Sequence, residues 1–189
     1  MKLNGNLLVL FFLLLGLSLT GCEKELIEPT TTDTISPALR SGIGHFRPDQ
    51  QCGTSRFGEL VSGSTVMGTV EILNDANDFY ILMDMNPNIF LETVFVYFGT
   101  SSGIPTNSAG DILTEDFQFQ AAIENGAAKY TVVHPVSGLP VCNDIVLAAV
   151  ATERNVFGNV VATHNLWLDG TAIHNGYFFK YCVQTCNSI

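Results

Sequence analysis

The sequence predicts an all-β fold, a disulfide-braced antiparallel β-sandwich. Apolar runs of strand length are rich in β-branched and aromatic residues, and Asn, Asp, Gly and Pro stand at their boundaries. No convincing helix start interrupts them. About nine short strands with closely spaced turn signals are typical of a β-sandwich.

The first half of this pattern reads as a meander. Strands are expected at residues 58–62, 65–73, 79–85 and 89–98. Glu92 interrupts the last of these apolar runs. A charged residue is unfavourable in a continuous core strand, so Glu92 predicts a sheet edge or a bend.

The second half begins with a long loop at residues 99–110, dense in Gly, Ser and Pro. Residues 145–151 are entirely apolar and predict a central strand, while residues 159–167 fit either a strand or a packed loop. Further strands are expected at residues 117–120, 129–134 and 177–183.

The N-terminus predicts export. Lys2 precedes an unbroken apolar run at residues 7–15, which is too short for a membrane span of ~20 residues and typical of a signal peptide. The following Leu-Thr-Gly-Cys resembles the lipobox of bacterial lipoproteins. That resemblance implies that residues 1–21 are removed and that Cys22 is acylated. We therefore expect an outer membrane lipoprotein that faces the periplasm or the cell surface.

Residues 22–51 are expected to form the lipidated N-terminus and a flexible tether. They hold a run of three threonines and three prolines, with little apolar periodicity. Such a segment cannot bury enough surface to offset its ordering entropy. The β-sandwich domain is then expected at residues 52–189.

The charge of the chain restricts its partners. Only Lys2 of the eight basic residues leaves with the signal peptide, so seven basic and 18 acidic residues give the mature chain a net charge of −11. Nucleic acid is an unlikely partner, because its binding depends on neutralising phosphates with Lys and Arg. Membrane attachment is expected through the acyl anchor.

Four cysteines remain once Cys22 is assigned to lipid. An even number in an exported chain predicts two disulfides, and the spacings do not fit a common zinc site. Three pairings are open. Cys182 and Cys186 would lie ~13 Å apart along an extended strand, which excludes a bond between them. If the last strand pairs antiparallel with residues 145–151, Cys142 lies opposite Cys186 and Cys52 is left for Cys182.

Short motifs between residues 68 and 110 resemble a largely uncharacterised family of envelope proteins. They are GTVEILND at residues 68–75, FYI at 79–81, VFVYFG at 94–99 and IPT at 104–106. The family consists of secreted or lipid-anchored β-sandwich proteins of Gram-negative bacteria. The resemblance implies fold and export and supplies no activity, so no functional residue is carried over.

The turn at residues 74–78 is a candidate calcium site. It concentrates the oxygen-bearing side chains that calcium requires, on Asn74, Asp75, Asn77 and Asp78. The alternative is a simple hairpin turn, since Asn and Asp cap their own backbone, and this reading is favoured. No other cofactor is expected.

Trp167 is the best candidate for a ligand-binding residue. An exposed tryptophan offers a large stacking face, and the neighbouring Asn165 and Asp169 could supply polar contacts. Core packing is the alternative for Trp167.

We expect a lipid-anchored binding module for a glycan or a protein, and no enzyme. A structural or assembly role in the outer membrane is the alternative. A small hydrolase is less favoured. Asp111, Glu115 and Asp116 could provide an acid and a base, but nothing in the sequence shows that they converge. No nucleophile-elbow motif indicates a catalytic triad. No catalytic residue is assigned.

Overall fold

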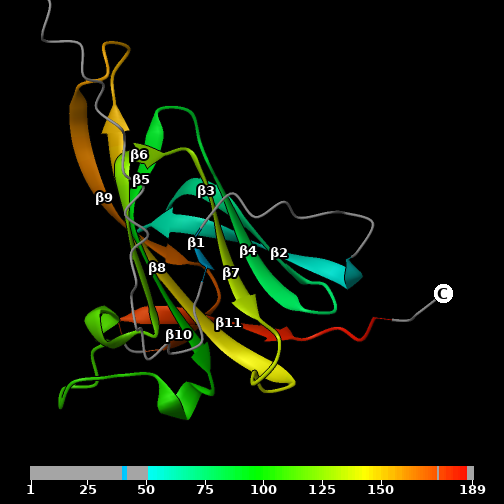
Figure 1. Cartoon of the computed structure of the whole chain (residues 1–189). Coiled ribbons are helices and arrows are strands. Elements are labelled where there is room, and N and C mark those ends of the chain that lie inside the picture. The colour runs from blue at the N-terminus through cyan, green and yellow to red at the C-terminus, as the bar shows by residue number, and fades with distance from the viewer. Residues whose placement is uncertain (1–39, 42–50, 174, 187–189) are drawn as a thin grey trace, which may run out of the picture. The chain divides into compact units, whose positions relative to one another are not determined.

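Antiparallel strands form nearly all of the regular structure in the computed structural model (Figure 1). The structure describes residues 40–41, 51–173 and 175–186, all of which belong to the compact unit Ser36–Ile189. The expected signal peptide, Cys22 and nearly all of the expected tether lie outside the described residues. No helix in these ranges is long and apolar enough to cross a membrane.

The all-β prediction is confirmed. The strands are β1 Arg40–Ser41, β2 Cys52–Ser62, β3 Thr65–Asn74, β4 Asp78–Met85, β5 Ile89–Gly99, β6 Phe119–Ala127, β7 Lys129–Pro135, β8 Cys142–Arg154, β9 Val160–Leu168, β10 Thr171–Ile173 and β11 Gly176–Cys182. Two short 3-10 turns are η2 Ser101–Gly103 and η3 Thr114–Asp116. The segment expected to be a strand or a packed loop is thus strand β9.

All strand pairings are antiparallel, in the order β1-β7-β4-β3-β2-β9-β8-β11-β10, with β5 pairing β6 and β8. β8 is central, as predicted from its apolar sequence. One of its edges pairs with β5, and the other pairs first with β11 and then with β9. β2 joins β9 only at its end, through Leu60 and Val61. The sheet therefore folds back on itself at this junction.

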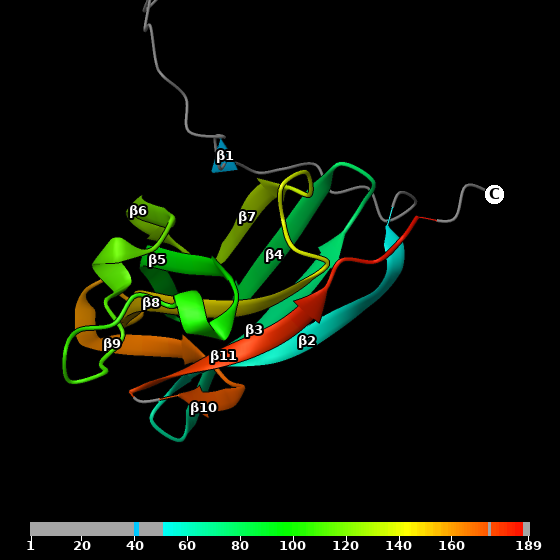
Figure 2. The same cartoon turned by 90° about the horizontal axis from the view of Figure 1, so that it is seen from below.

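The folded sheet encloses one main core. Alternate residues of β2, β3, β4 and β7 meet those of β5, β8, β9 and β11 in a single buried cluster. Phe79 of β4 packs edge-to-face against Phe98 of β5 and Tyr181 of β11, at centroid distances of 5.5 and 5.2 Å. Figure 2 shows β3, β4 and β7 running at an angle to β5, β8 and β9.

Glu92 marks a bend within β5. The register of β5 shifts between Leu91 and Thr93 against both neighbouring strands, which is a β-bulge. The bulge turns the Glu92 carboxylate toward Thr152 Oγ1 at 2.6 Å and Arg154 Nη2 at 2.8 Å. Of the two predicted outcomes, bend rather than edge is correct, since β5 lies between β6 and β8.

Two disulfides are present, but the predicted pairing is wrong. The bonds join Cys142 to Cys182 and Cys52 to Cys186. β11 does pair with β8 as predicted, yet its register sets Cys182 opposite Cys142. The prediction placed the strand four residues further along. An even slip leaves every side chain on its own face, so the apolar pattern could not reveal it.

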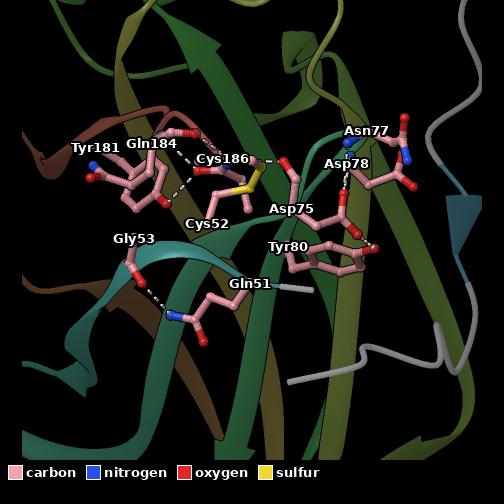
Figure 3. Close-up of a disulfide and its surroundings, with 11 residues drawn as sticks. Gln51, Cys52, Gly53, Asp75, Asn77, Asp78, Tyr80, Tyr181, Gln184 and Cys186 are labelled. Carbon is pink, nitrogen blue, oxygen red and sulfur yellow. Dashed lines mark hydrogen bonds between the residues drawn. A yellow bond between two sulfur atoms is a disulfide. The ribbon is translucent and has the colours of Figure 1, made fainter. Parts of the chain in front are cut away.

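Asn74 explains how Cys186 reaches Cys52. The buried Asn74 Oδ1 accepts hydrogen bonds from Tyr181 Oη at 2.9 Å and Gln184 N at 2.8 Å, and Asn74 Nδ2 donates to the Gln184 carbonyl at 3.0 Å. Asn74 also pairs with Cys52 across β2 and β3. The segment after β11 is therefore held beside Cys52 (Figure 3). Two bridges of this kind indicate an oxidising, exported environment.

Candidate binding groove on the outer face of the sheet

The loop between β5 and β6 covers the outer face of β5 and β8. Its residues Ile104, Ile112 and Phe117 are buried against Tyr97 and Val146, and they form a second apolar cluster. The loop was predicted from its composition, but its packing was not. Figure 1 shows it in green at the lower left.

Hydrogen bonds fix this loop to the sheet. Tyr97 Oη donates to the Thr100 carbonyl at 2.8 Å, and Ser101 N donates to Asp144 Oδ2 at 2.8 Å. Burial raises the pKa of the Tyr97 hydroxyl, and the charge of Asp144 adds to this shift. Ile112 N donates to Asn175 Oδ1 at 2.8 Å, which ties the loop to the turn before β11. These hydrogen bonds therefore hold the loop in place against the sheet.

A groove of about 290 Å³ lies beside this loop. The register aligns Phe95 of β5, Ala148 of β8 and Trp167 of β9 in one row across the sheet. The small alanine forms a floor between two aromatic side chains. The remaining lining residues include Thr114, Val150, Asn165 and Asn175. The arrangement offers aromatic side walls and amide groups.

Trp167 combines the two roles considered for it. The side chain is half-buried and packs against the second apolar cluster, while it also lines the groove. A Cβ atom added at Gly176 would lie 2.8 Å from Cζ3 of the indole and 2.7 Å from Cδ1 of Ile112. Gly176 therefore leaves room for the ring and sets its position.

The structure places the other two predicted contact residues differently. Asn165 is exposed and lines the groove with Trp167. Asp169 follows β9 and is not among the lining residues; its N–H donates to the Glu59 carbonyl at 2.8 Å, and its Oδ1 accepts from Gly170 N. Sequence reasoning missed Phe95, Ala148, Thr114 and Asn175. Alternation could have placed Phe95 on an outer face, but only the register brings it near Trp167.

The turn at residues 74–78 uses its oxygens internally. Asp75 Oδ1 accepts hydrogen bonds from the N–H groups of Asn77 and Asp78, both at 2.7 Å, and Asp75 Oδ2 accepts from Tyr80 Oη at 2.8 Å (Figure 3). Burial disfavours the ionised carboxyl, but these hydrogen bonds outweigh it and hold the pKa of Asp75 below its usual value. Burial and the neighbouring Asp75 raise the pKa of Tyr80.

These contacts bear on the calcium hypothesis. The amide oxygen of Asn74 points to Tyr181 and Gln184, whereas the Asp75 carboxylate faces its own turn. Within the described ranges, no group of three or more His, Cys, Asp or Glu side chains is placed to hold a metal ion. The Asp75 side chain therefore caps this turn, as the favoured hairpin reading expects, and the calcium site stays a prediction.

The acidic residues considered for hydrolysis are exposed on the covering loop. Asp111 accepts a hydrogen bond from Asn107 Nδ2 at 3.1 Å, and Glu115 and Asp116 belong to η3. None of the three lines the groove.

Comparison with known proteins adds no relative. No protein-family model matches the chain, and no curated protein or solved structure matches it. The envelope-family resemblance therefore stays a prediction from the sequence.

Proposed function

We propose that this protein is a lipid-anchored envelope or cell-surface protein that binds a glycan in the groove between Phe95 and Trp167. The observation that carries the proposal is the row in which two aromatic side chains flank the small Ala148. Sugar rings present apolar C–H faces that stack on aromatic side chains, and Trp and Phe offer such contact area.

The size and polarity of the groove support a short glycan. Its volume of about 290 Å³ is at the lower end of the ~300–1,000 Å³ found for small-ligand sites. Asn165 and Asn175 place amide groups at the groove, and each amide carries both donors and acceptors for hydroxyl groups. A protein ligand would need a larger contact area.

Binding without turnover is favoured over hydrolysis. Among the residues that the structure describes, those lining the groove are Phe95, Thr114, Ala148, Ala149, Val150, Asn165, Leu166, Trp167 and Asn175, and they include no Asp, Glu, His or Cys. Glycoside hydrolysis normally needs two carboxyl groups beside the scissile bond. The described lining residues thus offer recognition groups and no acid–base pair.

A glycan array with the full mature chain tests the proposal. The best glycan should bind the Trp167→Ala and Asn165→Ala variants about tenfold more weakly, a loss of ~1.4 kcal/mol per tenfold. Asp169→Asn is the matched control, because Asp169 is exposed on the same segment outside the groove. Trp167→Phe should retain part of the affinity and the packing on Gly176.

Circular dichroism and urea unfolding separate lost binding from lost structure. If the array gives no ligand, or Asn165→Ala binds as well as the unmodified chain, the groove is not a glycan site. A pull-down from envelope extract would then address the assembly role.

The anchor is tested separately. Changing Cys22→Ala should abolish labelling by palmitate and leave the precursor in the inner membrane. Palmitate incorporation into this variant would remove the lipoprotein assignment without affecting the groove.

A further inference from the structure

The end of the β8–β9 hairpin carries a cluster of exposed apolar side chains. Val156 and Phe157 in the turn are 88% and 84% exposed, and Val160 and Val161 at the start of β9 are 55% and 57% exposed. Adjacent strand residues point to opposite faces. Because both valines of β9 are exposed, the hairpin end projects beyond the packed sheet, as the top left of Figure 1 shows.

Several backbone N–H groups of this turn donate hydrogen bonds to acceptors within the turn itself. Asn155 Oδ1 accepts hydrogen bonds from Phe157 N at 3.0 Å and Asn159 N at 3.1 Å. Gly158 N donates to the Asn155 carbonyl, and Asn155 N donates to the Asn159 carbonyl, both at 2.9 Å. A segment that enters hydrocarbon must satisfy its polar backbone groups internally, because no water is available there.

Charge is also absent from the tip. Residues 155–163 contain no Asp, Glu, Lys or Arg. The nearest charged side chains along the chain contact neighbouring strands: Arg154 Nη2 lies 2.8 Å from Glu92 Oε1, and the partly exposed Glu153 Oε2 lies 3.4 Å from His164 Nε2. No charged side chain on this segment opposes its transfer to an apolar phase.

From these features we infer that the β8–β9 hairpin inserts its tip, Val156, Phe157, Val160 and Val161, into the surface of a lipid bilayer. Four side chains of this size expose less than the ~800 Å² per partner that a stable protein interface buries. They match instead the requirement of a shallow interfacial wedge, which reaches ~5–10 Å into the headgroup and acyl boundary.

The charge of the protein selects the lipid. The chain carries a formal net charge of −10, so an anionic surface would repel it. The expected target is therefore a zwitterionic bilayer. This inference needs neither the groove nor the acyl anchor.

Tryptophan fluorescence with quenching lipids tests the insertion. The chain has one tryptophan, so a Trp167→Phe background allows a single reporter to be introduced by Phe157→Trp. The full mature protein is mixed with phosphatidylcholine vesicles that carry bromine on their acyl chains. Emission from position 157 should fall about twofold and shift to shorter wavelength, as expected for a side chain at interfacial depth.

Phe57→Trp in the same background is the matched control. Phe57 is 69% exposed, but it lies on β2 beside Glu71, Asp84 and Lys129. Its emission should not change with vesicles, even where an acyl anchor holds the protein at the bilayer. Adding Val156→Asp to the Phe157→Trp chain should remove the quenching, while circular dichroism stays unchanged.

Three results of the vesicle experiment would overturn the inference. These are no quenching at position 157, equal quenching at positions 57 and 157, and persistent quenching in the Val156→Asp chain. A blue shift that depends on protein concentration in the absence of vesicles would also overturn it, because the tip would then contact a second copy. Glycan binding by the groove is measured independently, so failure of one proposal leaves the other standing.

Discussion

The two outer faces of the folded sheet differ sharply, although strand alternation generates both. On β5 and β8, outward residues such as Phe95, Tyr97 and Val146 are apolar, and the loop after β5 covers much of this face. The outer face of β2, β3, β4 and β7 instead presents Thr69 and Glu71 with similar polar neighbours, and no segment in the described ranges forms a second core over it. A pocket of about 250 Å³ on the open face is lined mainly by polar and charged side chains, whereas the groove on the covered face is lined mainly by apolar side chains and lies beside the covering loop.

The ion pairs on the two faces also differ, in how far their side chains are exposed to solvent. Glu92 and Arg154, on the covered side, have side chains that are only 27% and 23% exposed, and Arg154 also lies over the Phe90 ring at 4.8 Å. Asp84 and Lys129, on the open side, are 54% and 76% exposed. The exposed pair is the shorter of the two, at 2.6 Å against 2.8 Å, but it is expected to contribute less to stability because solvent screens it.

The largest expected effects come from the disulfides. Replacing Cys52 and Cys186 by Ser frees a sequence separation of 134 residues, whereas replacing Cys142 and Cys182 frees one of 40. Chain-entropy estimates give losses of ~5 and ~4 kcal/mol in the free energy of unfolding. Urea unfolding of the two double variants measures both. A larger loss for the Cys142–Cys182 pair would mean that β8–β11 packing, and not chain entropy, decides the order.

Truncating one phenylalanine on each face gives a direct test of the comparison. Phe117→Ala empties a site that is 4% exposed beneath the covering loop, and it should lower the free energy of unfolding by ~3 kcal/mol. Phe57→Ala removes a ring that is 69% exposed and should change it by less than ~0.5 kcal/mol. Comparable losses in urea unfolding would show that the open face is covered as well.

Neutralising one carboxylate on each face should give a smaller contrast. Glu92→Gln weakens the contacts with Thr152 and Arg154, and the expected loss is ~1 kcal/mol. Asp84→Asn disrupts only the exposed pair with Lys129 and should cost less than ~0.5 kcal/mol. Equal losses in thermal or urea unfolding would contradict the role given to burial.

The smallest expected effect is a pH dependence. The hydrogen bond from Thr152 outweighs burial and, with Arg154, holds the pKa of Glu92 below its usual value. Such a carboxyl stabilises the fold above its unfolded-state pKa and loses that contribution as the pH falls through its folded-state pKa. The unmodified protein should therefore lose slightly more stability than Glu92→Gln between about pH 5 and pH 3. Parallel curves in urea unfolding would show no linkage at Glu92.

Local patterns predicted most of the strands. The turn residues after β3, the apolar sequence of β8 and the misplaced charge at Glu92 each have a local physical meaning, and the structure agrees with them. The sequence of β9 fits either a strand or a loop, because its small and polar residues weaken the alternating pattern. In the structure its even positions Leu166 and Leu168 are buried, while its odd positions Thr163 and Asn165 are exposed.

Long-range register was less predictable. The observed β8–β11 register differs from the predicted one by four residues. The sequence could not reveal this difference, because a shift by an even number of residues leaves every side chain on the same face of its strand. The groove depends on two such registers at once, since Phe95 and Trp167 meet only through Ala148. Trp167 and Asn165 could be chosen from residue type alone, whereas their partners on β5 and in the covering loop could not.

The positions of Cys182 and Cys186 also set the order of events during biosynthesis. Both cysteines come after strands β1 to β10 in the chain. Cys182 is bonded to Cys142 at the start of β8, and Cys186 is bonded to Cys52 at the start of β2. A ribosome releases the earlier strands first. The bond to Cys142 cannot form until residue 182 has emerged, and the bond to Cys52 must wait for residue 186, so neither can close before nearly all of the chain has emerged. Closure then takes place on the oxidising side, after the last partner has arrived.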